Sequence, residues 1–254
     1  MSKIKMITGL LIGLMMAALL GGCGGQAANS KVLKVGMDAA FAPFEFQDDQ
    51  SKEYAGFDVD LMKALAKQMN VEVKFENIGF DGLIPALDSN NIDVIASGMS
   101  IKEERKAKVT FSQPYFKSGL SILVKKSNTT IQSFNDLAGK KIAVQIGSTS
   151  ADAAKKIPNA QVREFNTPPD AFMELASGGV DAVINDLPVN QDYINHSTNK
   201  DVKIVGDLLD AEDYGLAVAK KNTELAKKID DALTAIKQNG EYDKIHQKWF
   251  GEKK

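Results

Sequence analysis

Residues 140–166 read KKIAVQIGSTSADAAKKIPNAQVREFN, and the order of segments in this stretch decides the fold class. Residues 140–146 are an apolar run with β-branched side chains, typical of a buried strand, and residues 161–166 are a second strand-like run. Between them, residues 149–157 favour a helix that opens at the sequence GSTS. Because two strands joined through a helix run parallel, the stretch predicts a β–α–β unit and an α/β fold.

Strand-like and helix-like segments alternate along almost the whole chain. Further strands are expected at residues 31–38, 71–78, 92–97, 181–186 and 202–206, and further helices at residues 57–70, 81–89, 169–179, 223–240 and 241–250. Two more strands, at residues 111–126 and 212–221, have no helix before them. A chain that crosses to a second lobe and returns would produce two isolated strands of this kind. We therefore expect two lobes, each a mostly parallel sheet flanked by helices.

Residues 1–22 have the features of a secretory signal peptide. Two lysines precede an apolar run at residues 6–20, and these 15 residues are too few to span a bilayer as a helix. Cys23, the only cysteine, follows in the sequence LGGC, which resembles a bacterial lipobox, where the chain is cut before a cysteine that is then lipidated. We expect residues 23–30 to form a small, polar tether from a lipid-anchored Cys23. An ordinary signal peptide that contains a cysteine is the alternative.

The composition excludes several classes of function. Cleavage before Cys23 would leave 29 basic and 33 acidic residues, a formal charge of −4. The sequence has no basic block and no stripe of basic and aromatic residues, so we do not expect nucleic acid as a partner. No group of His, Cys and carboxylate residues has the spacing of metal ligands, so we expect neither a metal site nor a cofactor.

The residues that follow predicted strands are the candidate site, because ligands of open α/β sheets bind outside the carboxyl ends of the strands. Arg105 follows the strand at 92–97 and is one of only two arginines among 31 basic residues. Its planar guanidinium can hold a carboxylate through two parallel hydrogen bonds, as a lysine cannot. Before it, Gly98 permits close approach of the backbone and Ser100 presents a hydroxyl. The alternative is a surface arginine in a charged turn.

Two further strand ends complete a possible amino-acid site. Ser148 and Thr149 open a helix, where free amide groups and hydroxyls favour an anion. With Arg105 they predict a two-sided clamp for a carboxylate, and simple helix capping is the alternative. Asp186 ends an apolar strand and is either solvated or a receptor for a cation. A carboxylate clamp and Asp186 together match the backbone groups of a free amino acid.

Aromatic residues after the first strands suggest where a ligand side chain would lie. Phe41 and Phe80 either line a slot or pack into the core, and Asp38 adds a carboxylate beside that slot. Two rings with one carboxylate suit a long side chain that ends in a cation or an amide, since a ring face attracts a guanidinium or ammonium group. We expect Glu45 and Asp81 to be solvated.

Five stretches of the chain resemble the polar amino-acid-binding proteins of bacterial ABC importers. They are DAAFAPFEF (38–46), GFDVDLMKALAKQM (56–69), FDGLIPAL (80–87), SGMSIKEERKAKVTFSQPYF (97–116) and YDKIHQKWFG (242–251). The resemblance covers nearly all of residues 31–251 and implies the type II periplasmic-binding-protein fold with a double hinge. It implies a first lobe at residues 31–115, a second lobe at residues 116–214 and a return to the first lobe at residues 215–254.

The resemblance also implies roles for individual residues. The α-carboxylate of the ligand would be held by Arg105, Ser100, Ser148 and Thr149, the α-ammonium by Asp186, Ser100 and the Gly98 carbonyl, and the side chain by Asp38, Phe41 and Phe80. Glutamine-binding members carry a lysine where this chain has Gln145, and a histidine where it has Asn185. Loss of the lysine leaves Asp38 less compensated, which favours a cationic side chain. We therefore expect arginine or lysine as the ligand, with glutamine as the alternative.

The resemblance implies a monomeric, extracytoplasmic lipoprotein that closes its lobes on an amino acid and delivers it to ABC permease subunits. It would be lipid-anchored to the outer face of the cell membrane, in the periplasm if the cell is Gram-negative. A dehydratase-type enzyme on the same fold is an alternative that needs a proton donor or nucleophile over the substrate. His196 and His246, the only histidines, lie away from the strand ends, so we expect no catalytic residues. A receptor's sensory domain would also need a membrane-spanning helix and signalling modules on the same chain.

Overall fold

The computed structural model describes residues 32–198 and 200–251. The chain divides into two units, Met1–Ser30 and Lys31–Lys254, and every described residue belongs to the second. The predicted signal peptide, the lipidation site at Cys23 and the tether therefore lie outside the described residues. Within the described part of the chain, no helix is long and apolar enough to cross a membrane.

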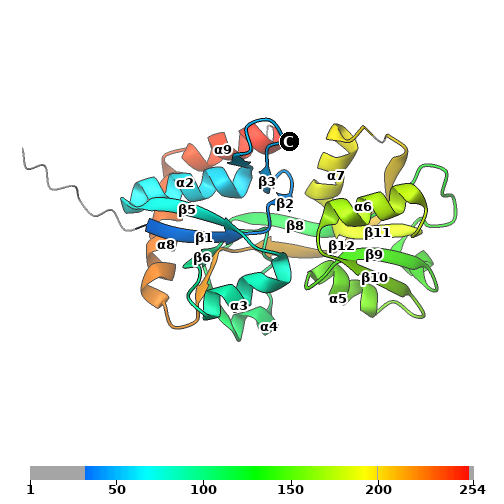
Figure 1. Ribbon diagram of the computed structural model, residues 1–254, viewed down its shortest axis with the longest axis horizontal. Helices are drawn as coiled ribbons and strands as arrows, with labels where there is room; N and C mark the ends of the chain where they lie inside the picture. The colour runs from blue at the N-terminus through cyan, green and yellow to red at the C-terminus, as the bar shows by residue number, and fades with distance from the viewer. Residues whose placement is uncertain (1–31, 199, 252–254) are drawn as a thin grey trace, which may run out of the picture. The chain divides into compact units, whose positions relative to one another are not determined.

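The second unit contains two five-stranded sheets, each with helices on both faces (Figure 1). The first sheet has the order β5 (Glu72–Asn77), β1 (Val32–Met37), β6 (Val94–Ile95), β13 (Ala217–Ala219) and β7 (Val109–Phe111). The second has the order β10 (Gln161–Phe165), β9 (Lys141–Gln145), β11 (Ala182–Asp186), β8 (Phe116–Lys125) and β12 (Val202–Tyr214). We call each sheet with its helices a lobe, the first and the second.

Four strands of each sheet run in the same direction. In the first lobe β1 is parallel to β5 and β6, whereas β13 is antiparallel to both of its neighbours. In the second lobe β9 is parallel to β10 and β11, and β8 is antiparallel to β11 and β12. The prediction of two mostly parallel sheets is confirmed, and the β–α–β unit at residues 140–166 is β9, a helix and β10.

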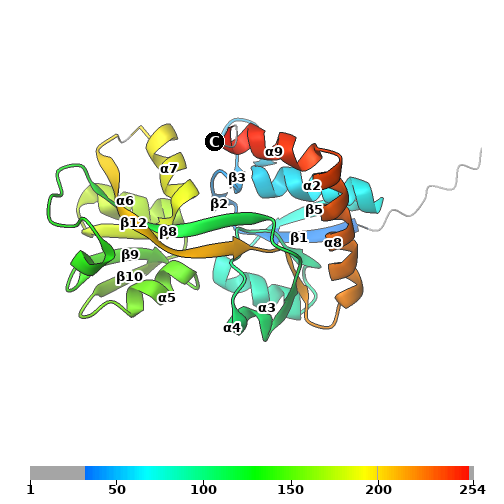
Figure 2. The same cartoon turned by 180° about the vertical axis from the view of Figure 1, so that it is seen from behind.

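Helices cover the two faces of each sheet (Figures 1 and 2). In the first lobe, α2 (Phe57–Met69) and α9 (Glu241–Phe250) lie on one face, and α3 (Leu83–Asp88) and α4 (Glu103–Lys106) on the other. Helix α8 (Thr223–Gln238) packs against α2 and α9. In the second lobe, α6 (Pro168–Ser177) and α7 (Leu187–His196) lie on one face and α5 (Thr149–Lys155) on the other. Short elements complete the list: η1 (Phe80–Gly82), η2 (Phe134–Leu137), and a small sheet of β2 (Ala40–Phe41), β3 (Glu45–Gln47) and β4 (Tyr54–Ala55).

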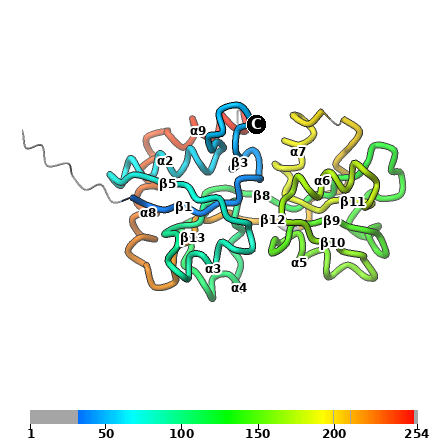
Figure 3. Tube along the Cα trace, viewed as in Figure 1, coloured from blue at the N-terminus to red at the C-terminus, as the bar shows by residue number. Residues whose placement is uncertain are grey.

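The chain passes between the lobes on two long, paired strands. Strands β8 and β12 are antiparallel from Phe116↔Tyr214 to Lys125↔Val202, with irregularities in the register near Leu209 (Figure 2). After β12 the chain returns to the first lobe as β13 (Figure 3). Strands β8 and β12 overlap the two isolated strands predicted at residues 111–126 and 212–221, but they begin and end at different residues.

The observed breaks in these strands differ from the predicted ones. A single strand was expected at 111–126, but the chain leaves the first sheet after Phe111 and enters β8 at Phe116. The expected gap at 207–211 lies inside β12, and the real change of sheet comes at Gly215. A Cβ on Gly215 would lie 2.8 Å from Ile101 Cδ1 and 3.0 Å from Phe111 Cδ1, so the chain changes sheets at a position where a larger residue would displace the Ile101 side chain.

A cluster of aromatic rings holds the start of β8 and the end of β12 against the first lobe. The Phe116 ring lies 4.9 Å from the Phe44 ring and 4.8 Å from the Phe250 ring, and the Tyr214 ring lies 5.2 Å from Phe44. Trp249 and Phe250 of α9 also pack against the main hydrophobic cluster. The crossing strands therefore start from a rigid, apolar base.

Candidate ligand-binding site

The predicted site residues lie at the carboxyl ends of strands in both lobes. Asp38 follows β1, Phe80 follows β5, and Gly98 and Ser100 follow β6 in the first lobe. In the second lobe, the residues at the corresponding ends are Gln145 on β9, Ser148 and Thr149 at the start of α5, and Asp186 on β11. Because parallel strands present these ends along one edge of their sheet, residues distant in sequence are brought together.

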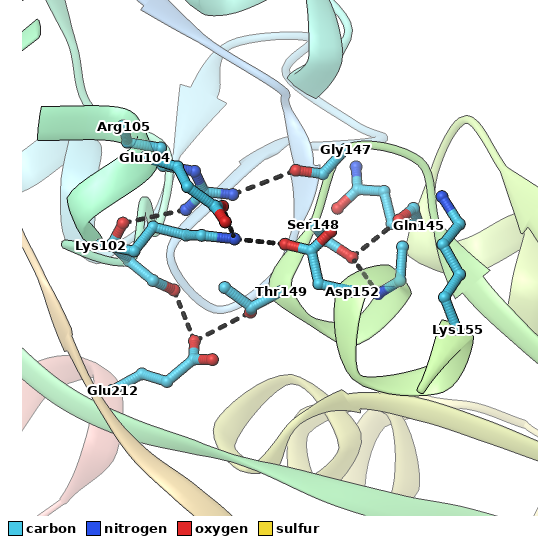
Figure 4. A network of polar contacts seen from close by, with 12 residues as sticks. Lys102, Glu104, Arg105, Gln145, Gly147, Ser148, Thr149, Asp152, Lys155 and Glu212 are labelled. Atoms are coloured by element: carbon cyan, nitrogen blue, oxygen red, sulfur yellow. Dashed lines mark hydrogen bonds and ion pairs between the residues drawn. The ribbon is translucent and has the colours of Figure 1, made fainter. Parts of the chain in front are cut away.

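Arg105 lies between the two lobes and is buried, with 7% of its surface exposed. Its Nη1 donates to the Ser100 carbonyl at 2.9 Å in the first lobe, and its Nη2 donates to the Gly147 carbonyl at 3.1 Å in the second (Figure 4). The guanidinium carbon lies 5.3 Å from the centre of the Phe80 ring. Burial lowers the pKa of Arg105 from its usual value, but arginine stays protonated in proteins. The alternative of a surface arginine is wrong.

The hydroxyls predicted to clamp a carboxylate have different contacts. Ser148 Oγ accepts from the Ala151 amide at 3.2 Å and donates to the Gln145 carbonyl at 2.7 Å, so it caps helix α5. Thr149 Oγ1 instead donates at 2.9 Å to the carboxylate of Glu212 on β12. The Ser100 hydroxyl donates to the same Glu212 oxygen, at 2.5 Å (Figure 4). The ligand roles of Ser100, Ser148 and Thr149 stay predictions.

Glu212 is the main residue that the sequence analysis missed. It lies on the crossing strand β12 and meets Ser100 of the first lobe and Thr149 of the second. In the sequence it is one acidic residue within DAED at 210–213, and no pattern separates it from its neighbours. An ion pair between Lys102, before α4, and Asp152 of α5 was also missed, and it too joins the two lobes (Figure 4).

Asp186 is a buried carboxylate and not a solvated strand end. Its Oδ1 accepts from Tyr214 Oη at 2.6 Å and from Ser118 Oγ at 2.8 Å. Burial, with the nearby negative charge of Glu212, raises its pKa to about 7. A cation bound to Asp186 would be favourable, because its positive charge would offset both the loss of hydration of the carboxylate and its repulsion by Glu212.

Asp38 and Gln145 make a second polar contact between the lobes. Gln145 Nε2 donates to Asp38 Oδ2 at 2.7 Å, and the Phe80 amide donates to the same oxygen at 3.3 Å. Burial, with smaller contributions from the charges of Asp81 and Asp170, raises the pKa of Asp38 to about 6. The neutral amide of Gln145 satisfies a hydrogen bond without cancelling this charge.

The two phenylalanines differ in their surroundings. Phe41 is buried in the main hydrophobic cluster and its ring stacks on Phe44 at 5.7 Å, which fits the core alternative. It also packs against Gly98, where a Cβ would lie 2.6 Å from Phe41 Cε1 and where φ is +47°. Phe80 is half-buried and faces the Arg105 guanidinium. A ligand contact for either ring stays a prediction.

The expectation for Glu45 was wrong, whereas Asp81 is exposed as expected. Glu45 is fully buried and accepts at 2.8 Å from the hydroxyl of Ser97, which in turn accepts from the Asp38 amide at 3.0 Å. Burial and the charge of the neighbouring Asp58 raise the pKa of Glu45 well above its usual range. A carboxyl group that stays protonated carries no charge and can be buried in this way. A glutamate in the sequence is therefore not always a surface residue.

A groove of about 1230 Å³ lies beside the crossing strands. Its lining includes Ser100, Thr149 and Glu212, but not Asp38, Arg105 or Asp186. Among the described residues, no group of three or more His, Cys, Asp or Glu side chains could hold a metal ion.

Residues 33–252 match the family model for bacterial extracellular solute-binding proteins, family 3. The chain belongs to this family. This family-3 protein is 36% identical to a probable histidine-binding protein of Neisseria gonorrhoeae, and the alignment covers 93% of this chain and 92% of the relative. It is also similar to an ancestral arginine-binding protein bound to arginine, with 49% identity, a TM-score of 0.84, and 87% of this chain and 98% of the other covered. A structure of an ancestral arginine-binding protein bound to glutamine has 49% identity, the same coverage and a TM-score of 0.82.

Proposed function

We propose that this protein is the extracytoplasmic substrate-binding component of an ABC importer for a polar amino acid. The observation that carries the proposal is Arg105, a buried guanidinium that contacts carbonyl groups of both lobes. These contacts use two of its five N–H donors. An α-carboxylate bound at the remaining donors would be held by a charge-assisted, two-pronged contact in a site shielded from water.

The charges around Arg105 support a zwitterionic ligand. Asp186 is a buried carboxylate on the second lobe, and the charge of Arg105 acts on it. An α-ammonium group could bind Asp186, Ser100 and the Gly98 carbonyl, while the α-carboxylate binds Arg105. Such a ligand brings one positive and one negative group to a site that offers the opposite of each, so its binding leaves little uncompensated charge.

Asp38 supports a basic side chain, arginine or lysine, on that ligand. Its carboxylate is buried, its hydrogen-bond partner Gln145 is neutral, and Asp81 and Asp170 add negative charge nearby. A guanidinium or ammonium group would supply the missing positive charge, and the Phe80 ring offers it a π face. Glutamine is the second candidate, because its amide could bind Asp38 by a hydrogen bond and because the similar ancestral protein has a structure with glutamine.

Closure of two lobes is the proposed mechanism of capture. We propose hinges near 115–116 and 214–215, in agreement with the course of β8 and β12 between the sheets. A ligand that bridges the lobes stabilises the closed state in proportion to its preference for that state. The closed, monomeric protein, anchored through lipidated Cys23, would then deliver the amino acid to permease subunits. No catalytic role is part of the proposal.

Thermal melting of the unit Lys31–Lys254 with each of the twenty common amino acids tests the proposal. A ligand that binds only the native state raises the melting temperature by mass action. We expect the largest rise with L-arginine or L-lysine. A larger rise with L-glutamine would keep the importer assignment and reject the basic side chain, and no rise with any of them would reject the amino-acid site.

A further inference from the structure

Glu212 accepts hydrogen bonds from two hydroxyl groups that are predicted to bind the carboxylate of an amino-acid ligand. Its Oε2 accepts from Ser100 Oγ at 2.5 Å and from Thr149 Oγ1 at 2.9 Å. Ser100 belongs to the first lobe and Thr149 opens helix α5 of the second, so one carboxylate joins both lobes. Figure 4 shows Glu212 reaching to the Thr149 hydroxyl, in the same network of polar contacts as the Arg105 guanidinium.

We infer that Glu212 competes with the ligand's α-carboxylate for the same hydrogen-bond donors. Before binding, the Glu212 carboxylate accepts their hydrogen bonds, and on binding the ligand carboxylate displaces it. The inference rests on the proposed function, because it takes Ser100 and Thr149 as donors to the ligand. It adds a residue of the crossing strand β12 that opposes binding.

Competition follows from the chemistry of the donors. A hydroxyl carries one proton and donates one hydrogen bond at a time, so Ser100 and Thr149 cannot serve Glu212 and a ligand carboxylate together. Glu212 is also the first of the negative charges that act on Arg105, and it raises the pKa of Asp186 by repulsion. Two carboxylates beside one guanidinium would repel each other, so the arrival of a ligand carboxylate favours the departure of Glu212.

The structure provides a place for the displaced side chain. Glu212 is half-buried and lines the groove of about 1230 Å³ beside the crossing strands. A rotation of its side chain toward this groove would return the carboxylate to water. The groove also contains Lys102 and Lys220, which offer positive charge nearby. Displacement therefore does not require a buried, unpaired charge.

The same contact gives Glu212 a second effect before a ligand arrives. Glu212 accepts hydrogen bonds from both lobes and so stabilises their contact, alongside the Lys102–Asp152 ion pair. A ligand then replaces a bridge that already exists, and the net gain on binding is smaller than its own contacts would provide. Removal of Glu212 should therefore strengthen binding.

Calorimetric titration of the wild type, Glu212→Ala and Glu212→Gln with L-arginine and with L-glutamine tests the inference. Glu212→Ala removes two charge-assisted hydrogen bonds from the competing state, and after the solvation of the displaced carboxylate is subtracted this corresponds to on the order of a tenfold change in Kd. We expect Kd to fall by about tenfold in Glu212→Ala, and by less in Glu212→Gln, whose amide oxygen can still accept a hydrogen bond. The factor should be similar for both amino acids, because they share the α-carboxylate.

Asp213→Asn is the matched control, since it removes one negative charge from the next position of β12 without changing the Glu212 contacts. Its Kd should stay within about twofold of the wild type. An unchanged Kd in Glu212→Ala, or weaker binding, would overturn the inference, since Glu212 would then be structural or a ligand contact. An equal gain in Asp213→Asn would also overturn it, because general charge would explain the effect. Failure of the wild type to bind any amino acid would instead reject the proposed function.

Discussion

Replacement of Gln145 by lysine should change the preference of the site between arginine and glutamine. Gln145 Nε2 lies 2.7 Å from Asp38 Oδ2, so a lysine ammonium at this position would pair with the Asp38 carboxylate. The proposed guanidinium of the ligand would then lose its attraction to Asp38 and meet a second cation. We expect the pKa of Asp38 to fall from about 6 in this variant, since an opposite charge favours the ionised form.

The size of the effect follows from the distance. Two unit charges about 4 Å apart interact by about 4 kcal/mol at an effective dielectric constant of 20. Part of this is lost to screening and to side-chain adjustment, so we expect arginine binding to weaken by about 2.7 kcal/mol, or about 100-fold in Kd. Glutamine carries no side-chain charge, and its Kd should change by less than about fivefold.

Calorimetric titration of the wild type, Gln145→Lys and Gln145→Met with both amino acids measures this difference. Gln145→Met has a side chain of similar length without charge or hydrogen-bond donors, so it removes the contact to Asp38 without adding a cation. In that control, the two Kd values should change by similar factors. Equal changes for arginine and glutamine in Gln145→Lys would refute the reasoning, because Asp38 would then have no role in recognising a cationic side chain.

Three further outcomes are expected. Arginine binding should weaken by more than about tenfold between pH 7 and pH 5, because the carboxyls of Asp38 and Asp186, with pKa values of about 6 and 7, both take up protons in that range; titrations at several pH values would show it, and a flat profile would contradict it. In urea titrations without ligand, the free energy of unfolding should fall as pH rises from about 5 to 8. Asp38, Asp58 and Asp186 have folded pKa values of about 6, 6 and 7, above their unfolded values, so the stability that they contribute at low pH is lost as they ionise. A rise in the free energy of unfolding over this range would contradict these pKa values. Gly98→Ala should destabilise the protein by about 2 kcal/mol in urea unfolding and weaken binding, because its Cβ would lie 2.6 Å from Phe41 and its φ is +47°. Gly79→Ala, whose Cβ would have its nearest contact at 3.5 Å, is the control and should leave the stability close to that of the wild type. Equal effects of the two substitutions would contradict the packing argument.

The sequence predicted those parts of the molecule that depend on local periodicity. Helix α2 begins and ends within one residue of the expected range 57–70, because its apolar residues recur at helical spacing. Helix α7 and the small β2–β3–β4 sheet were not predicted. In α7 the apolar face is weak, and the strands of the small sheet are too short for an alternating pattern to appear.

The polar residues of the site were harder to predict because long-range packing sets their surroundings. Arg105 could be selected because arginine is rare in this chain and follows a strand. Glu45 was misjudged, since its burial depends on Ser97 and Asp58, which come from distant segments. Glu212 was missed because the register of β8 with β12 sets its position, and no local pattern encodes that register.

Calorimetric titration of Arg105→Lys with L-arginine and L-glutamine tests the central claim most directly. The chain supplies a matched control in Arg163→Lys, since Arg163, the only other arginine, is exposed and pairs with Glu174. Lysine keeps the charge but cannot form the two-pronged contact, so we expect Kd to rise on the order of 100-fold for both amino acids in Arg105→Lys and to stay unchanged in Arg163→Lys. Equal, wild-type affinity in both variants would contradict the account, because Arg105 would then not hold the ligand's carboxylate.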